Sequence, residues 1–157
     1  MEPRIGITSE NRNSVAHVLN GFLADEFVLY LKTRNAHWNV EGPDFYERHK
    51  FFEEQYEQLD EVIDDVAERI RSIGHYAPAS LSAYSALTHL TEKSRSANTG
   101  AGFISELLAD HESIISRMRQ SINHFANDLN NAGSSDFITG LVEMHEKMAW
   151  MLRVQLK

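Results

Sequence analysis

Residues 45–73 read FYERHKFFEEQYEQLDEVIDDVAERIRSI, and their pattern predicts one long amphipathic helix. A rotation of about 100° per residue brings the large apolar side chains onto one stripe, which holds Phe52, Tyr56, Leu59, Ile63 and Ile70. Asp44 precedes the segment at a capping position, and Gly74, a residue typical of helix C-termini, follows it. The stretch therefore predicts a helix from Phe45 to Ile73.

Three further segments show the same three- and four-residue spacing of apolar residues, and we expect helices over about 13–38, 103–129 and 136–156. The long middle connection predicts a short helix over 81–90 and a loop over 94–102, and no segment reads as a strand. A long connection of this kind allows the second and third helices to run parallel. The sequence thus predicts an all-α four-helix bundle with a short helix in that connection, as a single domain over 1–157. A ferritin-like topology is favoured, and a plain up-down bundle is the alternative.

Composition excludes several classes of protein. Hydrophobic residues make up 42% and charged residues 24% of the 157 residues, the balance of a soluble globular protein. No run of eighteen apolar residues suggests a membrane span, and the N-terminus lacks the pattern of a signal peptide. Cysteine is absent, which excludes disulfides, thiolate zinc sites and cysteine nucleophiles. We expect a cytoplasmic protein.

The net charge leaves a DNA-compacting function open but disfavours it. The formal charge is −8, and the basic residues form neither a cluster nor a Lys-rich arm. Arg4 and Arg12 remain as candidate contacts in an N-terminal segment that could be mobile. A non-enzymatic bundle that serves as a surface antigen or interaction module is a further alternative.

The polar residues beside the apolar stripe of 45–73 suggest a metal site. His49, Glu53, Asp64 and Glu68 fall within an arc of about 100° that flanks the stripe. Ten acids lie between Pro43 and Ile70, so a solvated acidic face is the ordinary interpretation. These four residues, however, adjoin the face that must be buried, and a metal ion suits imidazole together with carboxylate.

One chain cannot bring the two ligand pairs together. His49/Glu53 and Asp64/Glu68 are each one helical turn apart, but their centres, at positions 51 and 66, are separated by about 22 Å along a helix. If two copies of this helix pack antiparallel about a two-fold axis, the first pair of one copy meets the second pair of the other. Each dimer would then hold two equivalent sites.

The alternative of a di-iron site within one bundle lacks its usual motif. Such sites use Glu-x-x-His, and none of the eight histidines has Glu three residues before it. The sequence therefore favours a site shared by two chains.

The run His37-Trp38-Asn39-Val40-Glu41-Gly42-Pro43-Asp44-Phe45, followed by His49, Glu53, Asp64 and Ala67-Glu68-Arg69, resembles the ferroxidase signature of the Dps family. These proteins, the miniferritins or DNA-binding proteins from starved cells, resemble this chain over nearly its whole length. The resemblance implies a homo-oligomeric, dodecameric hollow shell that oxidises Fe(II), preferably with hydrogen peroxide rather than oxygen, and stores Fe(III). It implies protection against oxidative stress.

Carried over by position, the resemblance assigns the ligands of iron. His37, His49 and Glu53 would come from one subunit, and Asp64 and Glu68 from its two-fold mate, which agrees with the spacing of the second helix. Spacing alone leaves His37 a capping or surface histidine. Trp38 would lie beside the site, either to take up oxidising equivalents or simply to pack.

Two positions qualify the resemblance. Many members have Asp where this chain has Glu53, whose side chain reaches one methylene further while the charge is kept. Asp110 resembles a pore-lining acid, although a solvated surface acid is its ordinary interpretation, and Arg119 stands about where a second pore acid can occur.

Overall fold

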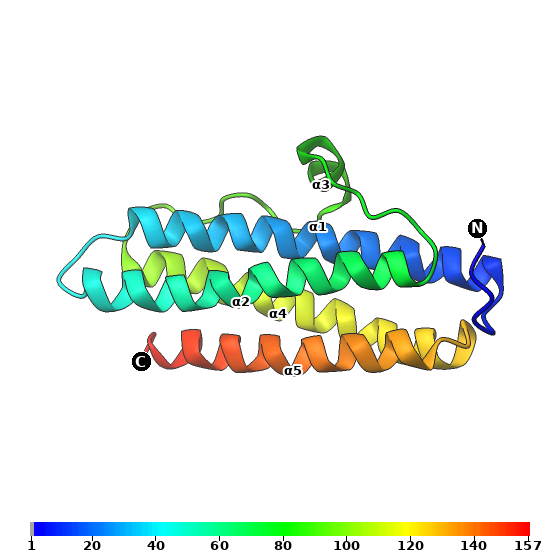
Figure 1. Cartoon of the computed structure of the whole chain (residues 1–157). Helices are drawn as coiled ribbons and strands as arrows, with labels where there is room; N and C mark the ends of the chain where they lie inside the picture. The colour runs from blue at the N-terminus through cyan, green and yellow to red at the C-terminus, as the bar shows by residue number, and fades with distance from the viewer. Residues whose placement is uncertain (1) are drawn as a thin grey trace.

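The computed structural model describes residues 2–157, which form long helices joined by loops (Figure 1). No strand occurs among these residues; Glu41 and Thr99 form one isolated parallel bridge. The helices are α1 (Ser9–Asn39), α2 (Phe45–Ser72), α3 (Leu81–Leu87), α4 (Gly100–Asn123), the π-helical turn η1 (His124–Asp128) and α5 (Ala132–Val154).

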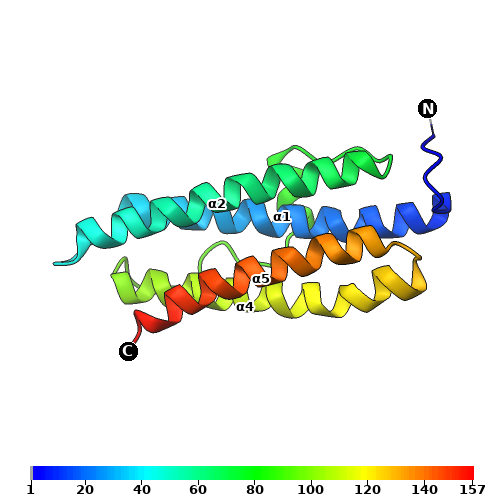
Figure 2. The ribbon, with the colours of Figure 1, turned by 60° about the horizontal axis from the view of Figure 1, so that its bottom comes forward.

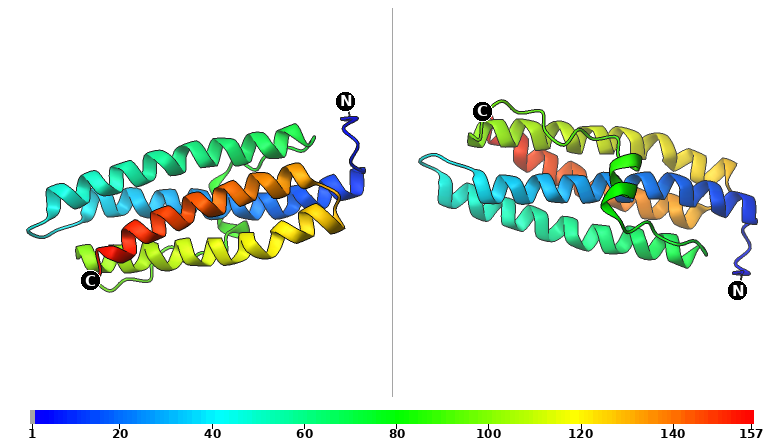
Figure 3. Two further views of the ribbon diagram at one scale, coloured as in Figure 1. Left: turned by 90° about the horizontal axis from the view of Figure 1, so that it is seen from below. Right: turned by 90° about the horizontal axis from the view of Figure 1, so that it is seen from above.

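The four long helices form a ferritin-like bundle of two antiparallel pairs. α1 and α2 form one hairpin, and α4 and α5 form the other (Figure 2). The connection after α2 returns along the bundle, and α3 lies across the outside of α1 (Figure 3). Because of this crossover, α2 and α4 run in the same direction, and the predicted fold class and helix directions are confirmed.

The predicted apolar stripe of α2 faces the core. Phe52, Leu59 and Ile70 are fully buried, while Tyr56 and Ile63 are half-buried at its edge. Their burial against α1 removes apolar surface from water, which is the main driving force for bundle formation. Other large side chains that are fully buried come from α1, α4, η1 and α5, among them Phe22, Phe103, Phe125, Leu19, Ile104 and Ile138.

Helix starts differ from the predictions where a polar side chain caps the helix earlier. The Thr8 hydroxyl accepts from the Asn11 amide at 3.2 Å, so α1 begins at Ser9 instead of near residue 13. The Asn131 side chain accepts from the Ser134 amide at 3.0 Å, so α5 begins at Ala132 inside the predicted break. Each cap satisfies an amide that the first turn leaves free.

Other boundaries also shift. α4 begins at Gly100, three residues early, because the Thr99 hydroxyl caps it, and it passes into the turn η1 near the predicted end. α3 ends at Leu87 rather than at residue 90. Asp44 stands at the N-cap position of α2 as predicted, yet its side chain forms no capping bond and accepts from Arg48 instead.

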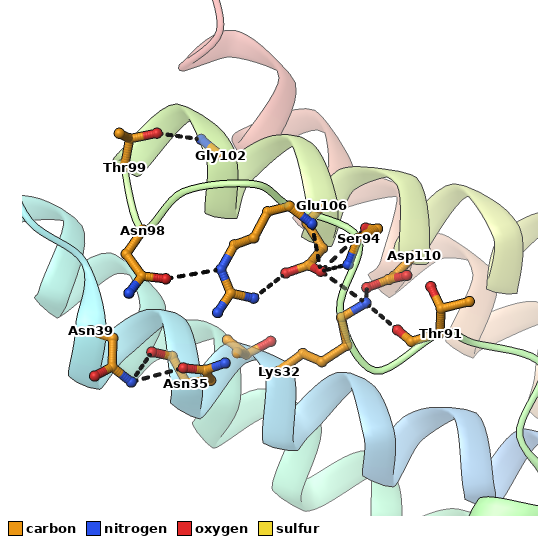
Figure 4. Close-up of polar contacts among 12 residues, drawn as sticks. Lys32, Asn35, Asn39, Thr91, Ser94, Asn98, Thr99, Gly102, Glu106 and Asp110 are labelled. Atoms are coloured by element: carbon orange, nitrogen blue, oxygen red, sulfur yellow. Dashed lines mark hydrogen bonds and ion pairs between the residues drawn. The ribbon is translucent and has the colours of Figure 1, made fainter.

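Buried charges hold the long connection against α1 and α4 (Figure 4). Lys32 donates to the Thr91 carbonyl at 2.7 Å and pairs with Asp110 at 2.6 Å, while Arg95 pairs with Glu106 at 2.6 Å. Burial raises the pKa of Asp110. Asp110 is 7% exposed, so its interpretation as a solvated surface acid is wrong: it is the partner of Lys32.

None of the helices in the described part of the chain combines the length and apolar character needed to span a bilayer.

Candidate metal centre

His37 and His49 form a stacked pair where α1 ends and α2 begins. His37 lies in the last turn of α1 and His49 in the second turn of α2, so the tight connection between the helices brings them together. Their ring centroids are 3.7 Å apart and their planes differ by 22°. His37 is only 7% exposed, whereas His49 is half-buried. The structure thus joins two predicted ligands that are twelve residues apart.

Two reciprocal hydrogen bonds set the orientation of these rings. The Nδ1 atom of His37 lies 2.8 Å from the carbonyl oxygen of His49, and Nδ1 of His49 lies 2.8 Å from the carbonyl oxygen of His37. A carbonyl oxygen can only accept, so each Nδ1 carries the proton and donates it. In each neutral ring the Nε2 lone pair is therefore left for another partner. Such a bond to Nδ1 is the usual support of a metal-binding imidazole.

Glu53 lies one turn after His49 and adds a carboxylate to the pair. Its Oε2 atom accepts from Lys50 Nζ at 2.5 Å. The hydrogen bond from Lys50 lowers the pKa of Glu53, with smaller electrostatic contributions from Lys50, His37 and His49. Glu53 is half-buried and Lys50 is exposed. The carboxylate is thus kept ionised by an exposed cation, which a metal ion could replace.

Asp64 and Glu68 lie further along α2 and are exposed to solvent. The single chain therefore leaves the carboxylates at this end of α2 in solvent, next to the half-buried Ile63 and Ala67. Asp64 lines a surface pocket together with Asp60, Glu61, Ile63 and Ala67. Within residues 2–157, no three His, Asp or Glu side chains converge closely enough to hold a metal ion. A complete ligand set would need a second chain.

Aromatic rings surround the His37 side of this centre. The Tyr56 ring stands edge-on to the His37 ring with centroids 5.2 Å apart, and Trp38 is 57% exposed beside it. The guanidinium of Arg34 lies over both aromatic rings. Arg34 was not among the predicted site residues, although Tyr30 and Trp38 lie four residues before and after it on α1, a spacing that makes them neighbours on a helix.

A second histidine pair lies in the middle of the bundle. His145 Nδ1 is 2.9 Å from His111 Nδ1, and His145 Nε2 is 2.8 Å from Glu26 Oε1. All three side chains are fully buried, and burial, reinforced by His145, lowers the pKa of His111 well below 6.5. The three groups bond to one another in series rather than converging on a common point. These residues do not form a Glu-x-x-His motif, because they come from three different helices, α1, α4 and α5.

The basic N-terminal residues offer little to a nucleic acid. Arg12 is 5% exposed inside α1, where it donates to the Ile7 carbonyl at 2.7 Å and to Glu2 at 2.8 Å. The expectation that Arg12 lies in a mobile segment is wrong, since these bonds hold it in place. Arg4 remains exposed.

Known proteins resemble this chain along almost its whole length. The family model for a ferritin-like domain matches residues 16–157. DNA protection during starvation protein 2 of Bacillus anthracis is 34% identical, covering 90% of this chain and 96% of its own. An uncharacterised low-temperature-induced protein of Nostoc is 40% identical, over 95% of this chain and 83% of its own.

A solved structure shows the same fold. The Dps protein of Vibrio cholerae O1, described as a member of a broad superfamily of ferritin-like diiron-carboxylate proteins, has a TM-score of 0.92 and 30% identity. The match covers 100% of this chain and 98% of that one. The class is thus that of ferritin-like proteins, and the chain belongs to the Dps family.

Proposed function

We propose that this protein is a ferroxidase and iron-storage miniferritin. In this proposal it oxidises Fe(II) with hydrogen peroxide, or more slowly with oxygen, at sites between two chains, and stores the Fe(III) inside a hollow shell of twelve subunits. Iron is the substrate and the cargo. The membership in the Dps family supports this function, and consumption of peroxide and Fe(II) together would protect the cell from oxidative damage.

The observation that carries the proposal is the pair of reciprocal hydrogen bonds between the rings and the backbone carbonyls of His37 and His49. Both Nδ1 atoms donate to backbone carbonyls at 2.8 Å, which leaves the two Nε2 lone pairs without a hydrogen-bond partner among residues 2–157. Glu53 adds an ionised carboxylate one turn away. Imidazole and carboxylate form the ligand set used for Fe(II), and the three side chains leave positions open for the oxidant.

Asp64 and Glu68 complete the proposed site from the neighbouring subunit. Both are exposed carboxylates on the same helix as His49, about four turns away. In an antiparallel dimer, Asp64 of the partner subunit and Glu68 of the partner subunit would face His37, His49 and Glu53. Among residues 2–157 no cation lies within 4 Å of either acid, which favours such an arrangement, since a metal ion would neutralise them.

In the proposed reaction, these residues bind the iron while it passes electrons to peroxide. Two Fe(II) ions each give one electron to one peroxide, which takes up two protons and leaves as two water molecules. The histidines and carboxylates bind Fe(II) and stabilise the additional charge of Fe(III). Glu57 and Glu61 are candidate acids for nucleating the mineral, and both are exposed.

An anaerobic titration with Fe(II), followed by hydrogen peroxide, tests the activity. We expect ferric absorbance to rise at once and the iron to stay with the high-mass protein. Slow iron oxidation at the rate of buffer alone, with iron lost on gel filtration, would reject the proposal.

A mixing experiment tests whether two chains share the site. His49→Ala subunits and Asp64→Asn subunits should each be inactive as pure shells. If they are unfolded and reassembled together in equal amounts, half of the dimers are mixed, and one of the two sites in each has all its ligands. We expect recovery of about a quarter of the wild-type activity. No recovery from well-assembled mixed shells would mean that each site lies within one chain.

A further inference from the structure

Arg34 directs its charge at three aromatic rings. Its guanidinium carbon lies 4.4 Å from the ring centroid of Tyr56, 5.1 Å from that of Trp38 and 5.5 Å from that of Tyr30. Its Nη1 also donates to the Tyr30 hydroxyl at 2.8 Å. Across residues 2–157 no carboxylate forms an ion pair with Arg34, although it is half-buried. The rings are therefore its main partners.

These rings adjoin the candidate metal centre. Tyr56 contacts the ring of His37, and Trp38 follows His37 in the chain. Phenol and indole are the aromatic side chains that lose an electron most easily. A site that brings Fe(II) and peroxide together therefore has three oxidisable groups at its edge.

The position of the cation decides how easily these rings are oxidised. A guanidinium over an aromatic face is attracted by the electron density of the ring. Removal of one electron gives the ring a positive charge and turns this attraction into repulsion. The hydrogen bond from Arg34 to the Tyr30 oxygen likewise opposes a loss of electron density there. Arg34 thus makes one-electron oxidation of all three rings less favourable.

We propose that Arg34 protects Trp38, Tyr56 and Tyr30 from oxidation, so that both electrons consumed by peroxide come from iron. This role rests on the proposed ferroxidase function. The competing reaction takes one electron from Fe(II) and one from a ring. Fe(II), hydrogen peroxide and the neutral ring give Fe(III), hydroxide, water and a neutral ring radical, and the phenol O–H or indole N–H hydrogen of the ring ends in the water. Arg34 disfavours this reaction, while the reaction with two Fe(II) ions is unaffected.

Trp150 supplies an internal reference within the same molecule. Trp38 and Trp150 are both 57% exposed, and in the described part of the chain a cation lies over the ring of Trp38 but not over that of Trp150. The first experiment exposes the assembled protein to photogenerated tris(bipyridine)ruthenium(III), a one-electron oxidant, and measures oxidation of each tryptophan by peptide mass spectrometry. The readout is the extent of oxidation of Trp38 divided by that of Trp150. This ratio is compared between variants, so that any burial of either tryptophan by neighbouring subunits affects all variants equally.

We expect this ratio to rise by about two- to fivefold in Arg34→Gln, the size of effect expected for a partly exposed cation–π contact. Arg34→Lys keeps the charge without the planar stacking and should lie between wild type and Arg34→Gln. Arg71→Gln is the matched control, because Arg71 lies 4.3 Å from the Tyr76 ring centroid and should leave the ratio unchanged. Should Arg34→Gln fail to assemble, the Lys variant carries the test. An unchanged ratio in the assembled Arg34 variants overturns the proposal.

The second experiment replaces the ruthenium oxidant with Fe(II) and hydrogen peroxide. In Arg34→Gln, oxidised Trp38 and Tyr56 per Fe(II) oxidised should rise about two- to fivefold over wild type. Normal iron oxidation without any rise would overturn the protective role at this site. If the wild type oxidises no iron while the ruthenium result holds, the ferroxidase function fails and the protection of the rings by Arg34 stands.

Discussion

The molecule contains two histidine pairs, which differ in the hydrogen-bond partners of their ring nitrogens. His37 and His49 bond to each other's backbone carbonyls, and neither Nε2 atom has a hydrogen-bond partner among the described residues. His111 and His145 bond ring to ring in the centre of the bundle, and Glu26 takes the far nitrogen of His145. The first pair is arranged to bind a further partner. The second satisfies most of its hydrogen-bonding capacity within the protein.

This difference teaches that the environment, and not the residue type, decides what a histidine pair can do. The carbonyl partners of His37 and His49 fix the proton on Nδ1 and leave a lone pair on each Nε2. In the core, with Glu26 ionised, His145 donates to Glu26 and accepts from His111. Only His111 Nε2 and Glu26 Oε2 are then left without a protein partner. The first pair should therefore control metal binding, and the second should control stability.

The largest effect on stability is expected from substitutions in the buried pair of His111 and His145. His145→Ala leaves the buried Glu26 carboxylate without its donor, and we expect a loss of about 3 kcal/mol or more in the free energy of unfolding. Denaturant unfolding of the assembled protein measures this change. His145→Gln, which can still donate to Glu26, is the control and should cost less. A loss below about 1 kcal/mol for His145→Ala would contradict the contrast between the pairs.

For the pair of His37 and His49 we expect a large effect on metal binding and a small effect on stability. His49→Ala is expected to weaken metal binding at least as much as the loss of an outer-shell partner does, about ten- to a hundredfold. Its free energy of unfolding should change by about 1 kcal/mol or less, because His49 is only half-buried. A spectroscopic titration with Co(II) measures the affinity. The exposed His17 provides a matched control, and equal losses in His17→Ala and His49→Ala would remove the site from this pair.

The free energy of unfolding should decrease at acid pH because of His111. Burial lowers the pKa of His111 well below 6.5 in the folded protein, so below about pH 6.5 the unfolded chain binds a proton that the folded chain does not. Stability should therefore decrease as the pH falls below 6.5, by up to about 1.4 kcal/mol per pH unit from this group. Unfolding curves between neutral and acid pH measure the slope. His111→Gln should reduce it and His17→Gln should not; equal slopes in wild type and His111→Gln would contradict the assignment.

The smallest effect on metal affinity is expected from substitution of Lys50, the cation that pairs with Glu53 beside His37 and His49. Lys50→Gln removes the ammonium that holds Glu53 at 2.5 Å and should raise the affinity for Co(II) by less than about tenfold, because exposed ion pairs are weak. The difference should shrink further in high salt. Lys147→Gln is a control on another helix. Weaker Co(II) binding by the Lys50 variant would show that Lys50 orients Glu53 instead of competing with the metal.

Much of the fold followed from local pattern. The stripe of Phe52, Leu59 and Ile70 predicted the buried face of α2, and Gly74, with φ of +95°, follows the C-cap Ile73 and ends that helix. Helix ends were predicted less well, because they depend on single capping bonds. Asn131 extended α5 backwards, and Asp44 stood at its cap position but bonded Arg48 instead.

The candidate site could be predicted only in part. The spacing within α2 pointed to His49 and Glu53, and to Asp64 and Glu68 as a separate pair, while His37 depended on family resemblance. The contacts of Asp110 with Lys32, and of Glu26 with His145, could not be predicted, because the members of each pair come from different helices that only packing brings together.

The sequence by itself determined the four long helices, the apolar stripe of α2 and the distance along that helix that separates the two pairs of candidate ligands. These follow from periodicity, which is a property of neighbouring residues. Only the tertiary structure decided that His37 stacks on His49 and that each ring donates from Nδ1 to the other residue's carbonyl oxygen. It also decided that Tyr56 of α2 lies against Arg34, whereas Tyr30 and Trp38 are one turn away from Arg34 on the same helix. The choice of hydrogen-bond partner and the position of a charge depend on which helices pack together, and no local pattern contains that information.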